Sequence, residues 1–146
     1  MELNEFCKKV EEIKLKNPLW FDLESDLKAT DTELFHVEEK LTNKLPKEYK
    51  DFVKIFGGGY FAFTTVYSVK ENSDWNILLN NINIGLISSH EFLAISDNYT
   101  GDYYGFKLNN GEYESKISFF DHETQQVKET KYKDIYEFLT DAGLRS

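Results

Sequence analysis

Two carboxylates, an amide and a glycine lie within six consecutive residues, Asp97-Asn98-Tyr99-Thr100-Gly101-Asp102. Oxygen ligands at such short spacing are the chemistry of a calcium loop, but the alternating Asp-x-Asn/Asp pattern and the glutamate at its twelfth position are both missing. Asp97 and Asp102 could also act as a general acid and base. Carboxylates on exposed loops are common, so a turn between two strands explains this segment better than a metal or catalytic site.

The other residue types that could do chemistry do not form a recognisable site. His36, His90 and His122 are widely separated and include no His-Glu-x-x-His motif. Cys7 lies on an apolar helical stripe, whereas a reactive thiolate needs an electropositive, partly exposed setting. The Gly57-Gly58-Gly59 run lacks the Lys-Ser/Thr of a phosphate-binding loop. The sequence therefore predicts a protein that is not an enzyme, with no cofactor and no metal.

The charge balance argues against direct binding to DNA or RNA. The 146 residues include 26 acidic and 17 basic side chains, which gives a formal charge of −9. Nucleic-acid binding depends on a basic stripe that neutralises phosphates, and often on arginines that contact phosphates or bases. Here 16 of the 17 basic residues are lysines, and Arg145 is the single arginine.

Length and hydropathy indicate a globular protein with one domain, residues 1–146. No apolar run approaches the ~18 residues that a membrane span requires. The segment Met1-Glu2-Leu3-Asn4-Glu5 lacks the basic and apolar regions of a secretory signal, and one cysteine cannot form an internal disulfide. We therefore expect a soluble, cytoplasmic protein without a membrane partner.

The acidic residues are concentrated in the middle of the chain. The segment from Glu71 to Glu114 contains seven acidic residues and one basic residue, Lys107. It therefore holds two thirds of the net negative charge of the chain. Such a segment is either a solubilising surface or a patch that attracts a basic partner, since complementary fields raise association rates by ~10-fold to 10³-fold. The charge alone favours the solubilising surface.

The elements that position these residues follow from hydrophobic periodicity. Three N-terminal segments have apolar residues at helical spacing and are predicted to form helices: 2–16, about 30–42, and a third that opens at Leu45-Pro46 and ends at Gly57-Gly58-Gly59. A last helical stripe runs from Tyr132 to Leu139, with Gly143 as its stop.

Between the glycines and the last helix, aromatic and β-branched residues predict strands. The expected strands are 60–69, 84–87, 92–96, 103–108, 115–120 and 126–130. Asn109-Asn110-Gly111 is predicted to be a hairpin turn, and the Asn-rich segment 72–83 to hold a short helix through Leu79. The expected fold is α+β, with an antiparallel sheet packed against N-terminal helices and a closing C-terminal helix.

At the second and third helices the sequence resembles the SUKH superfamily, which includes fungal cell-wall regulators and bacterial immunity proteins. The matching motif is Glu38-x-x-Leu41-x-x-x-Leu45-Pro46-x-x-Tyr49-x-x-Phe52-Val53, followed by the three glycines. Phe92 to Asp97, Gly101 to Phe106 and the closing helix resemble the later blocks. The resemblance covers about residues 30–142, while 70–90 matches no part of the family pattern.

The resemblance implies a binding protein. Its leading interpretation is a bacterial immunity protein that covers the active site of a cognate polymorphic toxin, a basic nuclease being the partner that an acidic surface would fit. The alternatives are a signalling or cell-wall regulatory scaffold and, least favoured, a small-molecule enzyme. From charge and aromatic pattern, the expected partner-binding residues are Glu91, Asp97, Tyr99, Asp102, Tyr103, Tyr104, Glu112 and Glu114.

Overall fold

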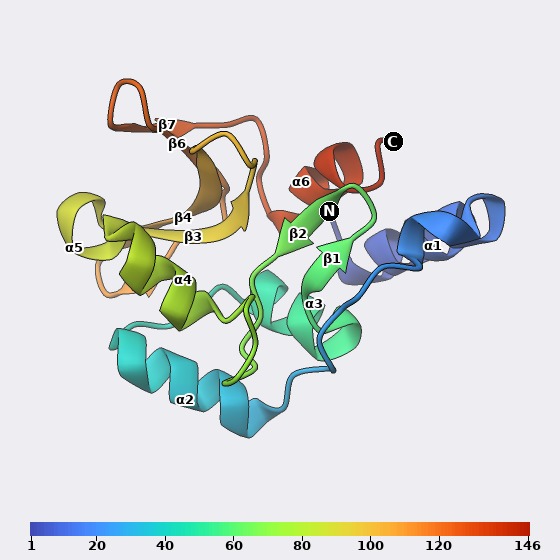
Figure 1. Ribbon diagram of the computed structural model, residues 1–146, viewed down its shortest axis with the longest axis horizontal. Coiled ribbons are helices and arrows are strands. Elements are labelled where there is room, and N and C mark those ends of the chain that lie inside the picture. Colours follow the sequence, from blue (N-terminus) through green and yellow to red (C-terminus); the bar gives the residue numbers. More distant parts are fainter.

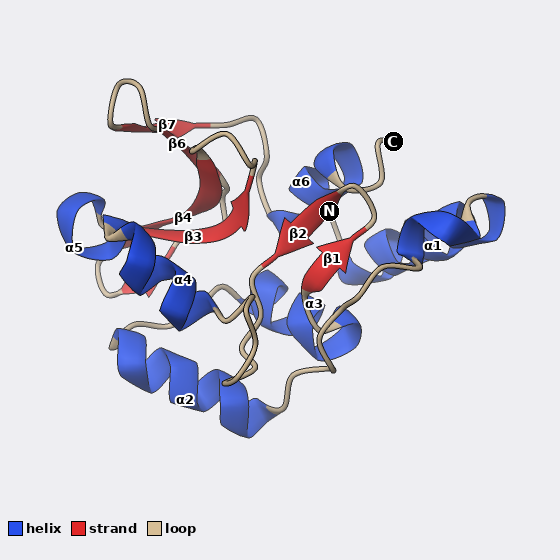
Figure 2. Ribbon diagram, viewed as in Figure 1, coloured by secondary structure: helices blue, strands red, loops and turns tan.

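The computed structural model describes residues 1–87 and 90–146, together with the backbone of residues 88–89 (Figures 1 and 2). In chain order, the elements are α1 (Leu3–Lys16), the 3₁₀ helix η1 (Pro18–Phe21), α2 (Asp31–Leu41), α3 (Lys47–Phe56), β1 (Gly59–Phe61), β2 (Thr64–Val66), α4 (Ile77–Ile84), α5 (Leu86–His90), β3 (Phe92–Asp97), β4 (Tyr103–Asn109), β5 (Glu112–Tyr113), β6 (Ser118–Asp121), β7 (Gln126–Glu129) and α6 (Ile135–Ala142). The predicted α+β fold class is confirmed. No helix in the described part of the chain is long and apolar enough to cross a membrane.

Two antiparallel sheets carry the strands. Within the described residues, the larger sheet has five strands in the order β3-β4-β6-β7, with β5 paired to β4. The smaller sheet is the β1–β2 hairpin, and Ser25 forms a bridge to Gly59 on its open side. Figure 1 shows the hairpin between the larger sheet and α1, with α6 behind it.

An aromatic core joins α1, α3, the hairpin and α6. The ring of Phe6 lies 5.0 Å from Tyr136, 5.9 Å from Phe61 and 6.2 Å from Phe52. All four side chains are at most 5% exposed. Burying each of them stabilises the fold by roughly 1.5–3 kcal/mol. The C-terminal helix is thus fixed to the first helix of the chain, although the two are far apart in sequence.

The predicted N-terminal helices are confirmed. At α2 the Thr30 hydroxyl accepts a hydrogen bond from the Glu33 N–H at 3.2 Å, and the Glu33 carboxylate accepts one from the Thr30 N–H at 2.9 Å. This reciprocal capping box satisfies two N–H groups that the helix leaves unpaired. Pro46 is the N-cap residue that precedes α3, whereas the sequence predicted that the helix opens at Leu45-Pro46. Gly57 has a φ of +88°, and a Cβ there would lie 1.9 Å from a backbone oxygen of Asp26, so glycine is required.

Two strand predictions are wrong. The segment 60–69, predicted as one strand, is a hairpin whose chain reverses at Ala62, a residue with a φ of +50°. The segment 84–87, predicted as a strand, contains the end of α4, the left-handed Gly85 and the start of α5. Its isoleucines favour strands intrinsically, but helix caps and tertiary contacts outweigh that preference here.

Neighbouring predictions are right in kind but displaced. The short helix expected through Leu79 spans Ile77–Ile84, because the Asn76 side chain caps the Leu79 N–H at 2.9 Å. The strand expected over 115–120 begins later, as β6 at Ser118, because the Ile117 N–H before it is donated to the Tyr132 carbonyl. The strands predicted from Phe92, Tyr103 and Gln126 and the hairpin turn at Asn110-Gly111 are confirmed.

The outer edge of β3 is covered by a buried asparagine. Asn81 of α4, 1% exposed, donates to the Ala94 carbonyl and accepts from the Ala94 N–H, both at 2.8 Å. Its amide therefore replaces a neighbouring strand, which leaves this edge unavailable for pairing with another chain. Towards the end of β3, the residue that follows β2 continues this cover, because Tyr67 donates its N–H to the Ile95 carbonyl at 2.8 Å.

Candidate functional site

The residues expected to contact a partner lie in two groups at opposite ends of the β3–β4 pair. In the antiparallel register, Phe92 faces Lys107 and Asp97 faces Tyr103. At ~3.4 Å per residue, the six residues of β3 separate the two ends by about 17 Å. We call one group the loop end: Asp97, Tyr99, Asp102, Tyr103 and Tyr104. We call the other group the far end: Glu91, Glu112 and Glu114.

The loop end is an ordered turn held by its own side chains. The Asp97 carboxylate accepts a hydrogen bond from the Tyr99 N–H at 2.6 Å. The Asn98 amide oxygen accepts from the Thr100 N–H at 3.0 Å and from the Asp102 N–H at 3.1 Å. Asx turns of this kind explain why Asn and Asp favour loops. The oxygens that suggested a calcium loop are therefore bonded to backbone N–H groups, and the predicted turn between strands is confirmed.

A histidine from another turn closes this network. Nδ1 of His122, which follows β6, lies 2.6 Å from Oδ1 of Asp102, and the His122 backbone N–H donates to the same oxygen at 2.9 Å. The side-chain hydrogen bond to Asp102 raises the pKa of His122 above its usual value of 6.5. Hydrogen bonds from the backbone and ring of His122 hold the pKa of Asp102 below 3.8. The pair ties the β3–β4 loop to the β6–β7 turn.

The same network holds a group of possible metal ligands that sequence spacing did not reveal. One side-chain ligand atom each from Asp102, Asp121 and His122 lies within 4.8 Å of the other two. The Asp121 carboxylate accepts from Lys128 at 3.0 Å and from the Glu123 N–H at 2.9 Å. Because these carboxylates already bond to N–H groups and a lysine, the arrangement is explained as a polar network that holds two turns together.

The three tyrosines of the loop end differ in what they can do. Tyr99 is 67% exposed, and its hydroxyl lies 2.9 Å from the Thr65 hydroxyl of β2. Tyr104 packs instead against Phe138 at 4.6 Å and Phe119 at 5.0 Å, and burial raises its pKa. Burial also raises the pKa of Tyr103. Tyr99 is therefore the tyrosine of this group best placed to contact a partner.

Two aromatic residues that are not among the expected partner-binding residues are linked to Tyr99 through Thr65. Tyr60 of β1 is the cross-strand partner of Thr65, so their side chains share one face of the hairpin. The ring of Trp75 lies 5.3 Å from that of Tyr60. Because Tyr60 and Phe61 are adjacent in one strand, the sequence predicts that one of them faces outward, and the structure shows that it is Tyr60. Its closeness to Tyr99 depends on the tertiary fold.

The far end is less ordered by side-chain bonds. Among the described residues, Glu91 and Glu112 make no side-chain hydrogen bond, and Glu114 accepts one from Asn109 at 3.3 Å. The backbone there is well paired, because Tyr113 donates its N–H to the Lys44 carbonyl. The far end thus presents two exposed glutamates, Glu91 and Glu112, without a side-chain hydrogen bond to the described residues, on a backbone that is paired.

The remaining candidates for chemistry occupy ordinary positions. Cys7 is half-buried, and burial together with Glu11 raises the pKa of its thiol, which disfavours a reactive thiolate. His36 is exposed on α2. The Nε2 atom of His90 lies 3.0 Å from the Gln125 carbonyl oxygen.

Comparison with known proteins finds a family model that matches most of this sequence. A family model described as SUKH_6, SMI1-KNR4 cell-wall, matches residues 31–139. The fold is also similar to a crystal structure of a protein from Pseudomonas syringae pv. tomato, with a TM-score of 0.71 and 15% sequence identity over 95% of this chain and 98% of that one. At this identity, the likeness shows the fold alone. No curated protein matches the sequence at a significant level.

Proposed function

Since the chain belongs to the family described as SUKH_6, SMI1-KNR4 cell-wall, we propose that it is an immunity protein that binds a cognate toxin and covers the toxin's active site. SUKH domains are known as immunity proteins and are generally non-catalytic. The observation that supports a binding role here is the ordered acidic turn of the loop end, with the exposed Tyr99 at its centre.

The loop end meets two physical requirements of a binding surface. Its backbone is already fixed by hydrogen bonds to Asp97, Asn98 and Asp102, so binding costs little additional ordering of the loop. An exposed tyrosine supplies a large contact area with few rotatable bonds, which is why tyrosines are frequent in interface centres. A stable complex around this turn would bury on the order of 800 Å² on each protein.

The charge of the chain supports a basic protein as the proposed partner. A net charge of −9 attracts a basic protein and repels nucleic acid. A nuclease holds phosphate groups in a cationic groove, so we propose a basic nuclease as the partner, encountered in the cytoplasm. The acidic turn would occupy that groove and exclude the nucleic acid, and neutralisation would therefore need no chemical step.

Co-expression tests the proposed function. The toxin encoded beside the gene is expressed in a host that it kills, with and without this protein. Restored growth and a stable complex of the two purified proteins are the expected results. Failure to bind any adjacent toxin domain would contradict the proposal, and a gene without a toxin neighbour would favour the regulatory scaffold.

Matched charge neutralisation tests which end of the sheet faces the toxin. Asp97→Asn keeps an oxygen for the Tyr99 N–H, and Glu123 is an exposed carboxylate in the β6–β7 turn that His122 ties to the loop end. We expect Asp97→Asn with Glu123→Gln to slow association with the toxin by about 3- to 10-fold at low salt and to flatten its salt dependence. The control, Glu91→Gln with Glu112→Gln, also removes two charges and should change the rate less. The opposite ranking would place the interface at the far end.

A further inference from the structure

Three aromatic side chains from separate parts of the chain form a row across the β1–β2 hairpin. We call Trp75, Tyr60 and Tyr99 the aromatic row. The rings of Trp75 and Tyr60 lie 5.3 Å apart at 74°, an edge-to-face contact. Thr65, opposite Tyr60 in the hairpin, bonds through its hydroxyl to that of Tyr99 at 2.9 Å. The row is therefore fixed by contacts within the protein before any partner binds.

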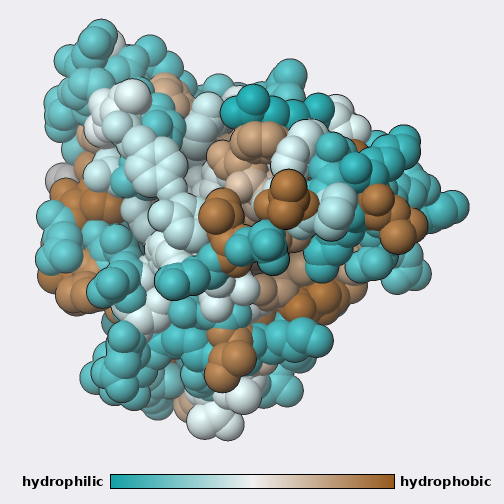
Figure 3. Space-filling view, turned by 45° about the vertical axis from the view of Figure 1, so that its right-hand side comes forward, coloured by the Kyte–Doolittle hydropathy of each residue, from teal (hydrophilic) through white to brown (hydrophobic). Residues whose placement is uncertain are grey.

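The row remains accessible from solvent. Tyr99 is 67% exposed and Tyr60 is 42% exposed, while Trp75 is half-buried. On the face shown in Figure 3, apolar groups are scattered among hydrophilic ones and do not form one continuous apolar patch. Two tyrosines and a tryptophan on such a mixed surface combine an apolar ring with a polar atom, as interface centres do.

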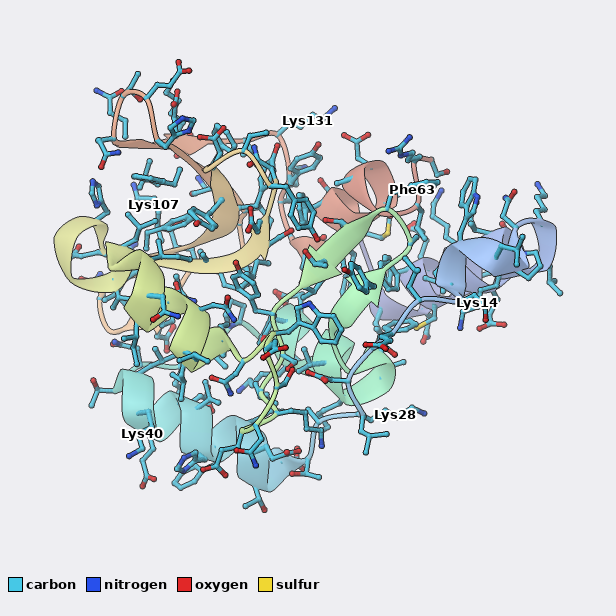
Figure 4. The ribbon with its side chains drawn as sticks, in the orientation of Figure 1. Lys14, Lys28, Lys40, Phe63, Lys107 and Lys131 are labelled. Carbon is cyan, nitrogen blue, oxygen red and sulfur yellow. The ribbon has the colours of Figure 1, made fainter. Side chains whose placement is uncertain are left out.

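Other aromatic rings of this protein hold cationic side chains over their faces. The Arg145 guanidinium lies 3.9 Å from the ring centre of Phe63, at the turn of the same hairpin (Figure 4). Lys14 lies 5.4 Å from the ring centre of Phe21. Within the described residues, no arginine or lysine lies over a ring of the aromatic row. The turn of the hairpin thus holds an internal cation, and the row does not.

Acidic residues adjoin the backbone of each member of the row, and Lys14 lines one hollow together with Tyr60. Glu24 accepts the Tyr60 N–H through its backbone carbonyl at 3.1 Å, Asp74 precedes Trp75 in the sequence, and Asp97 accepts the Tyr99 N–H. The Asp97 carboxylate is thus held at the Tyr99 end of the row, while Glu24 and Asp74 are exposed residues next to Tyr60 and Trp75 along the backbone. Negative faces of aromatic rings and nearby carboxylates both favour a cation, and desolvation strengthens the attraction.

We propose that the aromatic row is the receptor for an arginine side chain that projects from a basic partner protein, with the Asp97 carboxylate at its Tyr99 end. Arginine fits better than lysine because its planar guanidinium stacks on rings and is less strongly hydrated. This inference rests on the proposed function, because it names the side chain of the toxin that the immunity protein would grip.

The chemistry of the receptor can be tested without the toxin. A capped peptide with two arginines between glycines is titrated into the full-length, isotope-labelled protein, and its counterpart with the neutral citrulline is the matched probe. We expect chemical-shift changes at the Trp75 indole N–H and at the amides of Tyr60 and Tyr99 with the arginine peptide. Equal shifts with both peptides, or arginine-specific shifts centred elsewhere, would overturn the inference.

Single-ring variants assign the binding to the aromatic faces. Tyr60→Leu and Tyr99→Leu should each weaken the arginine peptide by about two- to fivefold, and Tyr99→Phe should retain most of the affinity because it keeps the ring. Phe35→Leu is the control, since Phe35 is 64% exposed on α2. Thermal melting identifies a variant that has lost its fold. Trp75 is not substituted, because Trp75→Leu would change the packing more than Tyr60→Leu. Unchanged affinity in both folded tyrosine variants would contradict the proposal.

Growth rescue separates this inference from the proposed function. Wild-type protein that rescues growth but gives no arginine-specific shifts would retain the immunity role and remove the receptor. Arginine-specific shifts at the row, together with failure to neutralise an adjacent toxin, would retain the receptor and remove the immunity role. If both hold, Tyr60→Leu should speed dissociation of the toxin complex by about two- to fivefold, and Phe35→Leu should leave it unchanged.

Discussion

The loop end and the far end carry similar charge but differ in order. At the loop end, the Asp97 and Asp102 carboxylates accept hydrogen bonds from backbone N–H groups and from His122. At the far end, Glu91 and Glu112 form no side-chain hydrogen bond with the described residues. A count of charges along the sequence treats these ends as one patch, whereas a partner would meet two surfaces about 17 Å apart.

The difference matters because binding affinity depends on preorganisation as well as charge. A carboxylate held by its neighbours presents its negative charge in one geometry, while an exposed glutamate loses side-chain entropy when a partner orders it. The ordered end also adjoins the aromatic row, so charge and apolar contact area occur together there. The three glutamates of the far end do not combine charge with apolar contact area in this way. Their charge is better suited to attracting a basic partner over a long distance.

Loss of the asparagine that covers β3 should have the largest effect, because both ends depend on this strand. Asn81→Leu leaves the N–H and the carbonyl of Ala94 buried without partners. We expect the free energy of unfolding to fall by about 2–4 kcal/mol in urea denaturation. Asn83→Leu, at an exposed position of the same helix, should change it by less than about 0.5 kcal/mol. Equal stability of both variants would show that α4 does not hold the edge.

Removing one carboxylate at each end should give a smaller, unequal effect. Asp102→Ala deletes the acceptor for the N–H groups of His122, so we expect the melting temperature to fall by about 2–4 °C and amide exchange at His122 to accelerate. Glu112→Ala removes a charge of the same sign without a side-chain hydrogen bond and should leave the melting temperature unchanged. Similar shifts for the two variants would remove the distinction between the ends.

The smallest expected effect is a pH dependence confined to the loop end. The raised pKa of His122 means that its contribution is complete below pH 6.5 and is lost as the pH rises through the folded-state pKa. The lowered pKa of Asp102 means that its contribution is complete above pH 3.8 and is lost as the pH falls through its folded-state pKa. The pair should therefore be most stabilising between about pH 3.8 and 6.5.

An NMR titration of the His122 ring checks this window. In the wild-type protein, the His122 pKa should lie above 6.5, and Asp102→Asn should lower it, because the variant keeps an oxygen acceptor but loses the negative charge. Glu112→Gln provides the far-end control and should leave the titration unchanged. An equal His122 pKa in wild type and Asp102→Asn would contradict the assigned ion pair.

Local sequence signals predicted the elements whose ends satisfy their own hydrogen bonds. Thr30 and Glu33 form a capping box within four residues, and the α2 boundary follows from it. The turn at 97–102 likewise follows from Asn and Asp side chains that bond to backbone N–H groups two to four residues ahead. Prediction failed at 84–87, because Gly85 ends α4 and Asn81 fixes that helix on β3 through contacts distant in sequence.

By itself, the sequence determined the fold class, the acidic balance that argues against nucleic acid, and the turn between β3 and β4, because each depends on composition or on neighbouring residues. The tertiary structure decided which acidic residues share a surface, because a rigid strand separates Glu91 from Asp97. It also decided that Trp75, Tyr60 and Tyr99 form one row, because hairpin register and a hydroxyl contact join segments that the sequence keeps apart.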